Sequence, residues 1–252
     1  MGIEIVPLAG LPMVRSGDDL CAMLLEGCAA NDVALADGDI VCVAQKIVSK
    51  AEGRLIPLST VTPSEEAQAL AAETDKDPRL AQLILDESSE ILRKRPGVTI
   101  VRHKLGIVGA NAGIDQSNVE HDGGEAALLL PVDPDASAAA LKSALESATG
   151  CKLGVIITDS HNRPWRLGTI GAAIGAAGVT VLDDYRGGED IFGRELKVTL
   201  INQADAIAAA ATLVMGETTE KIPAAVIRGV PMTSTPGKAA DIQRPLEEDL
   251  FR

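Results

Sequence analysis

Polar side chains follow several apolar stretches of the sequence, at points where a buried strand or helix would end. Asp115 lies in the segment Gly-Ile-Asp-Gln-Ser-Asn, Asp159 and Ser160 close an apolar run, and Glu217 follows an Ala-rich run. Carboxylate and hydroxyl oxygens are the hard ligands that Mg²⁺ and Mn²⁺ prefer. These positions are therefore candidates for binding a divalent metal. The same residue types also form turns, and residues 158–160 would equally serve as a helix N-cap.

The loop that begins at Gly216 has the composition of a nucleotide-binding loop. Gly216 gives the backbone freedom, and Thr218 and Thr219 offer hydroxyl and N–H groups to phosphates. The Walker A pattern GxxxxGK[ST] is absent from the chain. Lys46 and Lys50 would share one face of a helix and could neutralise a triphosphate. The alternatives are a helix C-cap followed by a turn, and lysines exposed to solvent.

Two arginines surround the single tryptophan, Trp165. Arg163 and Arg166 could bind an anion beside a stacking surface, or could belong to a solvated basic loop. The sequence has no GxSxG motif, and none of its three histidines lies beside a nucleophile signature. The four cysteines match neither a zinc pattern nor a CxxC pair, which indicates small buried side chains in a reducing cytosol.

The elements that position these residues do not alternate regularly between strand and helix. We expect a hairpin from 98–101 and 105–108, and one or two helices within 63–94. Helix 136–149 is expected to have Asp135 as its N-cap, and helix 204–215 to end at Gly216. The small residues of 170–178 would let another backbone approach closely. The remaining expected elements are helix 20–30 and strands 3–7, 38–44, 128–131, 155–159, 179–182, 196–200 and 224–228. This order favours an α+β fold over a doubly wound parallel sheet.

Composition limits the classes of protein. The chain has 252 residues, 46% of them hydrophobic but only 2% aromatic, which predicts one globular unit, or two intimate lobes, with an aliphatic core. The formal net charge of −13 disfavours nucleic acid as a partner. No apolar run reaches about 18 residues and no signal peptide is evident, so we expect a cytoplasmic protein without a membrane partner.

Taken together and in order, these segments resemble the coenzyme F420-0:γ-glutamyl ligase family. The likeness runs through residues 10–12, 17–19, 45–54, 113–119, 130–137, 157–160, 163–166, 172–178, 215–217, 227–229 and 248–252. The resemblance implies an α+β fold with mixed and antiparallel sheets, outside the common nucleotide-binding classes, in an intertwined homodimer. It implies a single ligase domain over residues 1–252, without the C-terminal nitroreductase-like redox domain of two-domain relatives.

The resemblance also implies an activity: GTP-dependent ligation of L-glutamate to the deazaflavin precursor coenzyme F420-0 through an acyl phosphate, followed by γ-linked glutamate addition. By position, Asp115, Asp159, Ser160 and Glu217 correspond to ligands of two divalent ions, Mg²⁺ or Mn²⁺, and K⁺ is a further candidate ion. Asp115, Asp159 and Lys50 are the expected catalytic residues. The positions that correspond to GTP contacts are Leu11, Pro12, Met13, Val14, Gln45, Lys50, Asn118, Met215, Gly216, Glu217, Thr218, Thr219, Glu220, Lys221 and Ile222.

We assign Arg163 and Arg166 to the phosphodiester or carboxylate of the acceptor. The chain departs from many relatives at His161-Asn162 and at residues 167–169, both in the expected acceptor loop, which leaves the exact acceptor open. The alternatives are a glutamate ligase for a folate- or pterin-like acceptor and a GTP-binding regulatory module. The residues alone do not distinguish GTP from ATP, and they fix neither the preferred metal nor the number of glutamates.

Overall fold

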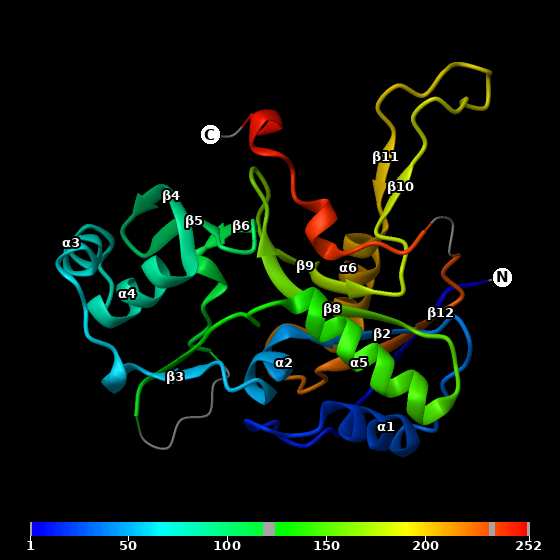
Figure 1. Cartoon of the computed structure of the whole chain (residues 1–252), viewed down its shortest axis with the longest axis horizontal. Coiled ribbons are helices and arrows are strands. Elements are labelled where there is room, and N and C mark those ends of the chain that lie inside the picture. Colours follow the sequence, from blue (N-terminus) through cyan, green and yellow to red (C-terminus); the bar gives the residue numbers. More distant parts are fainter. Residues whose placement is uncertain (1, 118–123, 232–234, 251–252) are drawn as a thin grey trace.

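A mixed five-stranded sheet forms the centre of the molecule (Figure 1). The computed structural model describes residues 2–117, 124–231 and 235–250. Strands β2 and β8 are parallel, and the other neighbours are antiparallel. In spatial order the strands are β1 (Glu4–Pro7), β12 (Ala224–Arg228), β2 (Ile40–Ala44), β8 (Gly154–Asn162) and β9 (Thr169–Ala177).

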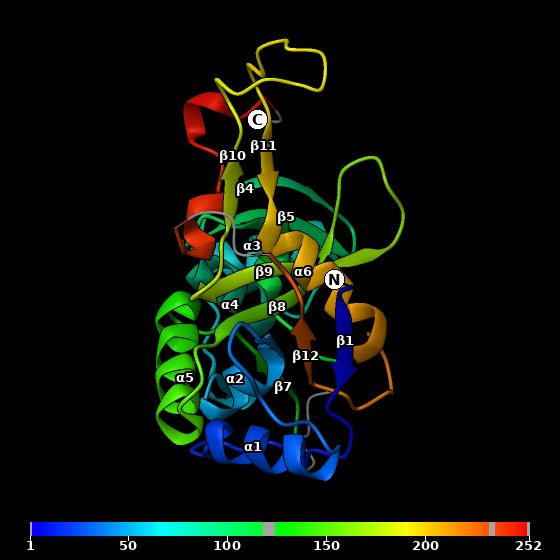
Figure 2. The same cartoon turned by 90° about the vertical axis from the view of Figure 1, so that its right-hand side faces the viewer.

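Alternate residues of the central strands supply two hydrophobic layers. Val41 and Val43 pack with helices on one face, whereas Ile40 and Cys42 pack with a helix on the other. This follows from the two-residue period of a strand, which buries both faces of a central strand when both are covered. The first face is covered by α1 (Leu20–Ala30), α2 (Gln45–Ala51) and α5 (Pro134–Thr149), and the second by α6 (Gln203–Met215) (Figures 1 and 2).

A smaller antiparallel sheet lies beside the central one, in the order β4–β5–β6. Two helices pack near it through Leu70, Leu83 and Ile84. The strands are β4 (Ser88–Arg95), β5 (Val98–His103) and β6 (Val108–Ala110), and the helices are α3 (Glu65–Thr74) and α4 (Pro78–Glu87). A two-stranded pair, β3 (Leu55–Pro57) with β7 (Ala126–Leu128), connects this part to the central sheet. Short 3-10 helices cover Leu58–Thr60, Asn111–Gly113, Ala239–Ile242 and Leu246–Glu248.

A hairpin projects from the body of the molecule (Figures 1 and 2). Its base is formed by β10 (Leu182–Asp184) and β11 (Leu200–Asn202), and residues 185–199 extend beyond them. The C-terminal segment packs back on the smaller sheet, where Asp249 Oδ2 lies 3.0 Å from Arg102 Nη2. No helix of the described residues is long and apolar enough to cross a membrane.

The expectation of an α+β fold with mixed and antiparallel sheets is confirmed. Corrections concern the ends of elements. Within 63–94 there are two helices, but residues 88–94 belong to strand β4, because they pair with β5. The strands expected at 128–131, 179–182 and 196–200 lie instead at β7, β10 and β11. Leu129 and Leu130 are buried outside a strand, which explains the apolar signal at that point.

The N-cap of α5 also differs from the prediction. Asp133, not Asp135, accepts the hydrogen bond from Ala136 N–H. Asp135 points elsewhere: its carboxylate accepts the N–H groups of Ala176 in β9 and of Ala239 and Ala240 in the C-terminal segment. One carboxylate therefore holds three backbone segments together.

Candidate functional site

A cavity of about 870 Å³ opens between helix α2, strand β8 and the loops that follow β1 and α6. The segments that line it are far apart in the sequence. Among the sequence-predicted nucleotide contacts, its wall contains Leu11, Pro12, Met13, Val14, Gln45, Lys50, Met215, Gly216, Glu217, Thr218, Thr219, Glu220, Lys221 and Ile222. Asn118 lies outside the described residues. The fold thus brings the predicted set to one cavity.

Helix α2 presents polar side chains to this cavity, because it begins directly at the end of β2. Gln45 is buried, and its amide is oriented at both ends: Oε1 accepts from Ser49 Oγ at 2.9 Å, and Nε2 donates to Asp115 Oδ2 at 2.7 Å. Lys46 and Lys50 line the cavity from the same helix. Thr158, at the end of the parallel pairing with β2, is also buried there, and its Oγ1 has no hydrogen-bond partner among the described residues.

Asp115 is held by backbone hydrogen bonds to the end of β7. Its N–H donates to Leu128 O at 2.9 Å, and Leu128 N–H donates to Asp115 O at 2.8 Å. The carboxylate forms an ion pair with Lys46. Burial raises the pKa of Asp115 above its usual value and nearby Asp159 adds to this rise, although Lys46 and Gln45 act in the opposite direction. Lys46 shares the helical spacing with Lys50, but its pairing with Asp115 has no signal in the sequence.

Asp159 and Ser160, adjacent in strand β8, have different side-chain neighbours. Asp159 lies close enough to Asp115 to affect its pKa, and His161 Nε2 lies 3.4 Å from Asp159 Oδ2. Ser160 Oγ donates to Glu217 Oε2 instead. The alternative of a helix N-cap at 158–160 is wrong, because the strand continues to Asn162 in register with β9.

The acidic residues therefore form two pairs with neighbours, Asp115 with Asp159 and Glu217 with Ser160. Among the residues that the structure describes, no group of three or more His, Cys, Asp or Glu side chains is gathered closely enough to hold a metal. The donors are nonetheless of the type that suits Mg²⁺ or Mn²⁺, since all are carboxylates or hydroxyls. Two neighbouring carboxylates with a raised pKa at one of them also favour a cation between them.

His161 is a site residue that sequence reasoning did not select. Burial alone would lower its pKa, but the contact with Asp159 and the charges of Asp159 and Asp205 outweigh burial and raise it. The departure of His161-Asn162 from related sequences was the available signal. The structure makes His161 the neighbour of a predicted metal ligand.

The loop after α6 curls over one side of the cavity. Gly216 has a φ of +74°, and a Cβ at this position would lie 2.3 Å from Glu220 Cδ. Thr218 N–H donates to Glu220 Oε2 at 2.8 Å, which fixes the bend. The glycine is required here by both its backbone angle and the close approach of the Glu220 side chain.

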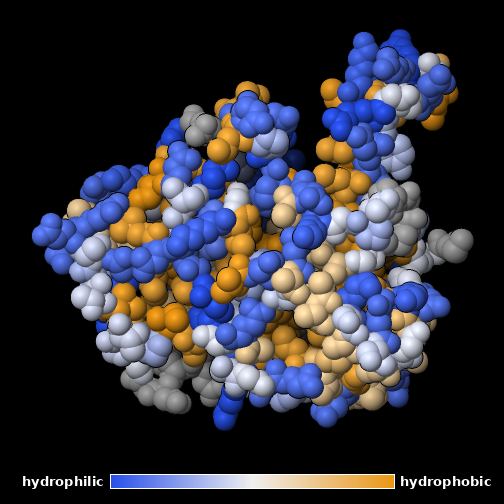
Figure 3. Space-filling model, in the orientation of Figure 1, coloured by the Kyte–Doolittle hydropathy of each residue, from blue (hydrophilic) through white to orange (hydrophobic). Residues whose placement is uncertain are grey.

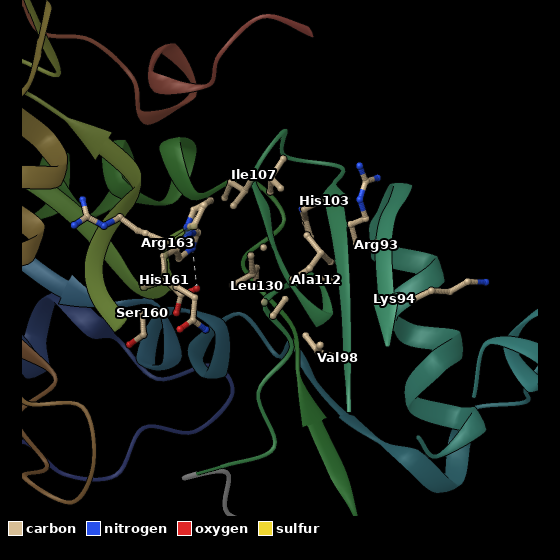
Figure 4. Close-up of a pocket in the computed structure, with 18 of the residues that line it drawn as sticks. Arg93, Lys94, Val98, His103, Ile107, Ala112, Leu130, Ser160, His161 and Arg163 are labelled. Carbon is tan, nitrogen blue, oxygen red and sulfur yellow. Dashed lines mark ion pairs between the residues drawn. The ribbon is translucent and has the colours of Figure 1, made fainter. Parts of the chain in front are cut away.

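The two predicted acceptor arginines lie in the exposed turn between β8 and β9. Arg163 lines another cavity, of about 650 Å³, and its side chain extends away from His103 and Leu130 (Figure 4). Arg166 lines neither cavity, and its N–H donates to Arg163 O at 3.3 Å. Trp165 is 84% exposed. The turn thus carries cationic and stacking groups at the surface.

This arrangement combines lysines, hydroxyls, loop N–H groups and oxygen ligands around one cavity, which suits a nucleoside polyphosphate with divalent cations. A family model described as "F420-0:Gamma-glutamyl ligase" matches residues 10–229. The chain is 44% identical to the coenzyme F420:L-glutamate ligase of Methanothermobacter thermautotrophicus, over 100% of both chains.

Two further relatives show the same degree of likeness. Identity is 43% to the coenzyme F420:L-glutamate ligase of Archaeoglobus fulgidus, over 100% of this chain and 97% of that protein. It is 44% to the enzyme of the same name from Methanopyrus kandleri, over 99% of this chain and 97% of that protein. In each of these three comparisons the alignment covers at least 97% of both sequences.

Proposed function

The chain belongs to the F420-0:gamma-glutamyl ligase family, and from this premise we propose that it joins L-glutamate to coenzyme F420-0, with GTP as cosubstrate, in coenzyme F420 biosynthesis. The relatives named for this ligase activity support the choice of reaction. The observation that carries the use of a nucleotide is the cavity of about 870 Å³, lined by Lys46, Lys50 and the loop 215–222.

Asp115 and Asp159, and separately Ser160 and Glu217, would hold two divalent ions, Mg²⁺ or Mn²⁺. The support for this proposal is the two-pair arrangement of oxygen donors and the raised pKa of Asp115. When bound, the ions would offset the negative charge of the triphosphate. A role for K⁺ and the cytoplasmic location remain predictions from the sequence.

The chemistry requires activation, because a free carboxylate is a poor electrophile. We propose that a carboxylate oxygen of the acceptor attacks the γ-phosphorus of GTP, the bond to the β–γ bridging oxygen breaks, and GDP leaves. The amine of glutamate then attacks the carbon of the acyl phosphate and loses a proton, and inorganic phosphate leaves with the C–O bond electrons. Repetition on the new γ-carboxylate would add a γ-linked glutamate.

The residues of the chain position the reactants and supply charge in this scheme. Lys50 and Lys46 line the cavity from one helix and would stabilise the charge that develops on the transferred phosphoryl group. Ion pairing with Asp115 holds the Lys46 ammonium beside the predicted metal ligands. The curled loop at Gly216 would shield the acyl phosphate from water, which otherwise hydrolyses it.

The experiment incubates the protein with F420-0, L-glutamate, GTP and Mn²⁺ and analyses the products by mass spectrometry. We expect F420 species longer by one or more glutamates, with sustained GDP formation only when glutamate and acceptor are both present. Sustained GDP formation in the absence of both would favour a regulatory GTPase, and reaction with a folate-like acid in place of F420-0 would favour the other acceptor class.

Asp159→Ala tests the metal ligands. We expect GDP formation to fall at least about a hundredfold, because a carboxylate that binds the metal is lost. The variant should keep the circular dichroism spectrum of the wild type. Asp86→Ala, at an exposed position of α4, is the matched control and should retain activity. A fully active Asp159→Ala enzyme would refute the metal assignment.

A further inference from the structure

The cavity of about 650 Å³ lies between the small sheet β4–β5–β6 and the hairpin formed by β8 and β9 (Figure 4). It is separate from the proposed nucleotide cavity but shares two wall residues with it, Asp159 and Ser160. A group bound in one cavity can therefore meet a group bound in the other at these two residues.

The inner wall of this cavity is aliphatic. Val98 and Ile100 of β5, Ile107 and Val108 before and in β6, and Leu130 line it. Ile107 and Leu130 are buried, whereas Val108 is 42% exposed. Such a wall suits a flat or apolar part of a small molecule, since ligand cavities of this size are lined mainly by hydrophobic side chains.

The rim carries positive charge that the rest of the protein does not neutralise. Arg93 and Arg95 occupy alternate positions of β4 and both line the cavity. Within the described part of the chain, Arg93 donates only to the neighbouring carbonyl of Leu92, and no ion pair involves either arginine. In a chain of net charge −13, two such arginines at one cavity mark a local site for an anion.

Lys94, between the two arginines, behaves differently. Its Nζ lies 2.6 Å from Glu73 Oε2, and its side chain leaves the strand in another direction from Arg93 (Figure 4). Lys94 also lines the cavity, but its ammonium is already paired with Glu73, unlike the two arginines.

We propose that this second cavity binds the acceptor: a molecule with an apolar or planar part against the β5–β6 wall and anionic groups at Arg93 and Arg95. Its reacting carboxylate would lie at Asp159 and Ser160, where the two cavities meet. This inference rests on the proposed ligase function and deepens it. It assigns the acceptor contacts to one face of β4 and not to the exposed turn that contains Arg166.

The test uses the intact protein with GTP, Mn²⁺, L-glutamate and F420-0. Arg93→Ala and Arg95→Ala should each raise the KM for F420-0 by about tenfold or more, because each removes a charged hydrogen bond or ion pair to the ligand. The KM for GTP should change less than about twofold. Lys152→Ala, at an exposed position outside both cavities, should leave both constants unchanged.

A second substitution does not depend on removing an arginine. Val108→Glu places a negative charge on the exposed part of the cavity wall, and we expect the same selective rise in the KM for F420-0. Thermal unfolding of every variant, with and without GTP, reports whether the fold and the nucleotide cavity are intact.

The outcomes separate this inference from the proposed function. If the wild type forms no glutamate adduct of F420-0, the proposed function fails. If it does, and the Arg93, Arg95 and Val108 variants keep the wild-type KM for F420-0, the assignment of the second cavity is overturned. It is also overturned if Lys152→Ala gives the same loss, or if the KM for GTP rises equally.

Discussion

Glu87, at the end of α4, connects side chains from separate segments. Its Oε2 accepts from Arg54 Nη2 at 2.6 Å and lies 3.5 Å from His103 Nε2. Arg54 Nε also donates to Leu130 O at 2.8 Å. Burial alone would raise the pKa of Glu87, but the contact with His103 and the charges of Arg54, His103 and Lys104 outweigh it, so the pKa is lowered. The ionised form of Glu87 therefore stabilises the fold.

We predict that Glu87→Gln lowers the free energy of unfolding by about 1–3 kcal/mol at pH 7, because Arg54 loses a partly buried charged partner. The pKa of Glu87 is lower in the folded than in the unfolded chain, where it is near its ordinary value of 4.5. The stabilisation is thus fully present above that value and is lost as the pH falls through the folded-state pKa. Urea unfolding at pH 7, 5 and 3.5 measures the difference from wild type, which should shrink toward pH 3.5.

Asp86→Asn is the control for this prediction, since it changes an exposed carboxylate on the same helix. Its effect should stay within about 0.5 kcal/mol at every pH. A Glu87→Gln difference that stays constant from pH 7 to 3.5 would show that the ionised carboxylate does not carry the stabilisation.

At the residue scale, the sequence could identify the types of side chain at the site but not their partners. Turn-forming and acidic segments indicated Asp115, Asp159 and Glu217. The contact between Gln45 and Asp115 joins positions 70 apart, and that between Ser160 and Glu217 joins positions 57 apart. Such pairings depend on how β7 and α6 are placed, which local patterns do not specify. His161 was left out of the predicted site for the same reason, and the ion pair of Lys46 with Asp115 was not predicted.

At the scale of elements, strong periodicity or a capping residue made a prediction reliable. The helices at 20–30 and 204–215 were confirmed, with Asp19 as N-cap of the first and Gly216 at the end of the second. Strand β4 was mistaken for helix because Ala, Leu and Glu dominate the preceding 20 or so residues, roughly the span of two ordinary helices. Its charged residues are exposed and its pairing with β5 decides its conformation.

The small residues of β9 allow the backbones of neighbouring helices to approach this strand closely. A Cβ on Gly175 would lie 2.3 Å from Pro134 O, and one on Gly171 would lie 2.6 Å from Ala208 O. The backbones of helices α5 and α6 therefore lie in close contact with strand β9 at these two glycines. The expectation that another backbone comes close to 170–178 is confirmed, and the contact fixes the strand that pairs with Asp159 and Ser160.

We predict that Gly175→Ala lowers the free energy of unfolding by about 1–3 kcal/mol, because the methyl group forces strand β9 and the first turn of α5 apart. Gly109→Ala in strand β6 is a matched control, since nothing lies within 4 Å of its Cβ position. Its effect should be within about 0.5 kcal/mol. Chemical unfolding of both variants decides the matter, and equal stability of the two would argue against close contact at Gly175.

At the scale of the whole molecule, the order of the strands in the sheet could not be predicted from the sequence. The pattern of elements favoured α+β, but it gave no reason for the first strand β1 to pair with the last strand β12 in the sheet. That pairing is a contact between the two ends of the chain and is set by the packing of α1, α5 and α6 on the two faces. The parallel pairing of β2 with β8, which aligns α2 with Asp159, likewise could not be predicted from local sequence patterns.

The projecting hairpin 185–199 exposes large apolar side chains, and packing within a single chain does not explain them. Ile191 is 92% exposed, Phe192 84% and Val198 86%, and Figure 3 shows hydrophobic groups among polar ones on this projection. Large apolar side chains gathered on a segment with no core of its own favour contact with another chain. This favours the intertwined homodimer that the family resemblance implies, in which each hairpin would pack on the partner.

We predict that the wild type is a dimer and that Phe192→Glu shifts it toward monomer, because an aromatic side chain that the dimer would bury is replaced by a charge that must be desolvated. Loss of such an anchor costs about 2–4 kcal/mol, which is a rise of roughly 30- to 1,000-fold in the dissociation constant of the dimer. Size-exclusion chromatography with light scattering over a range of protein concentrations measures it. Leu213→Glu, which changes another apolar side chain of 84% exposure on α6, is the control and should stay dimeric. A monomeric wild type, or a Phe192→Glu variant with the dimer intact, would remove the hairpin from the interface and leave its apolar surface to another partner.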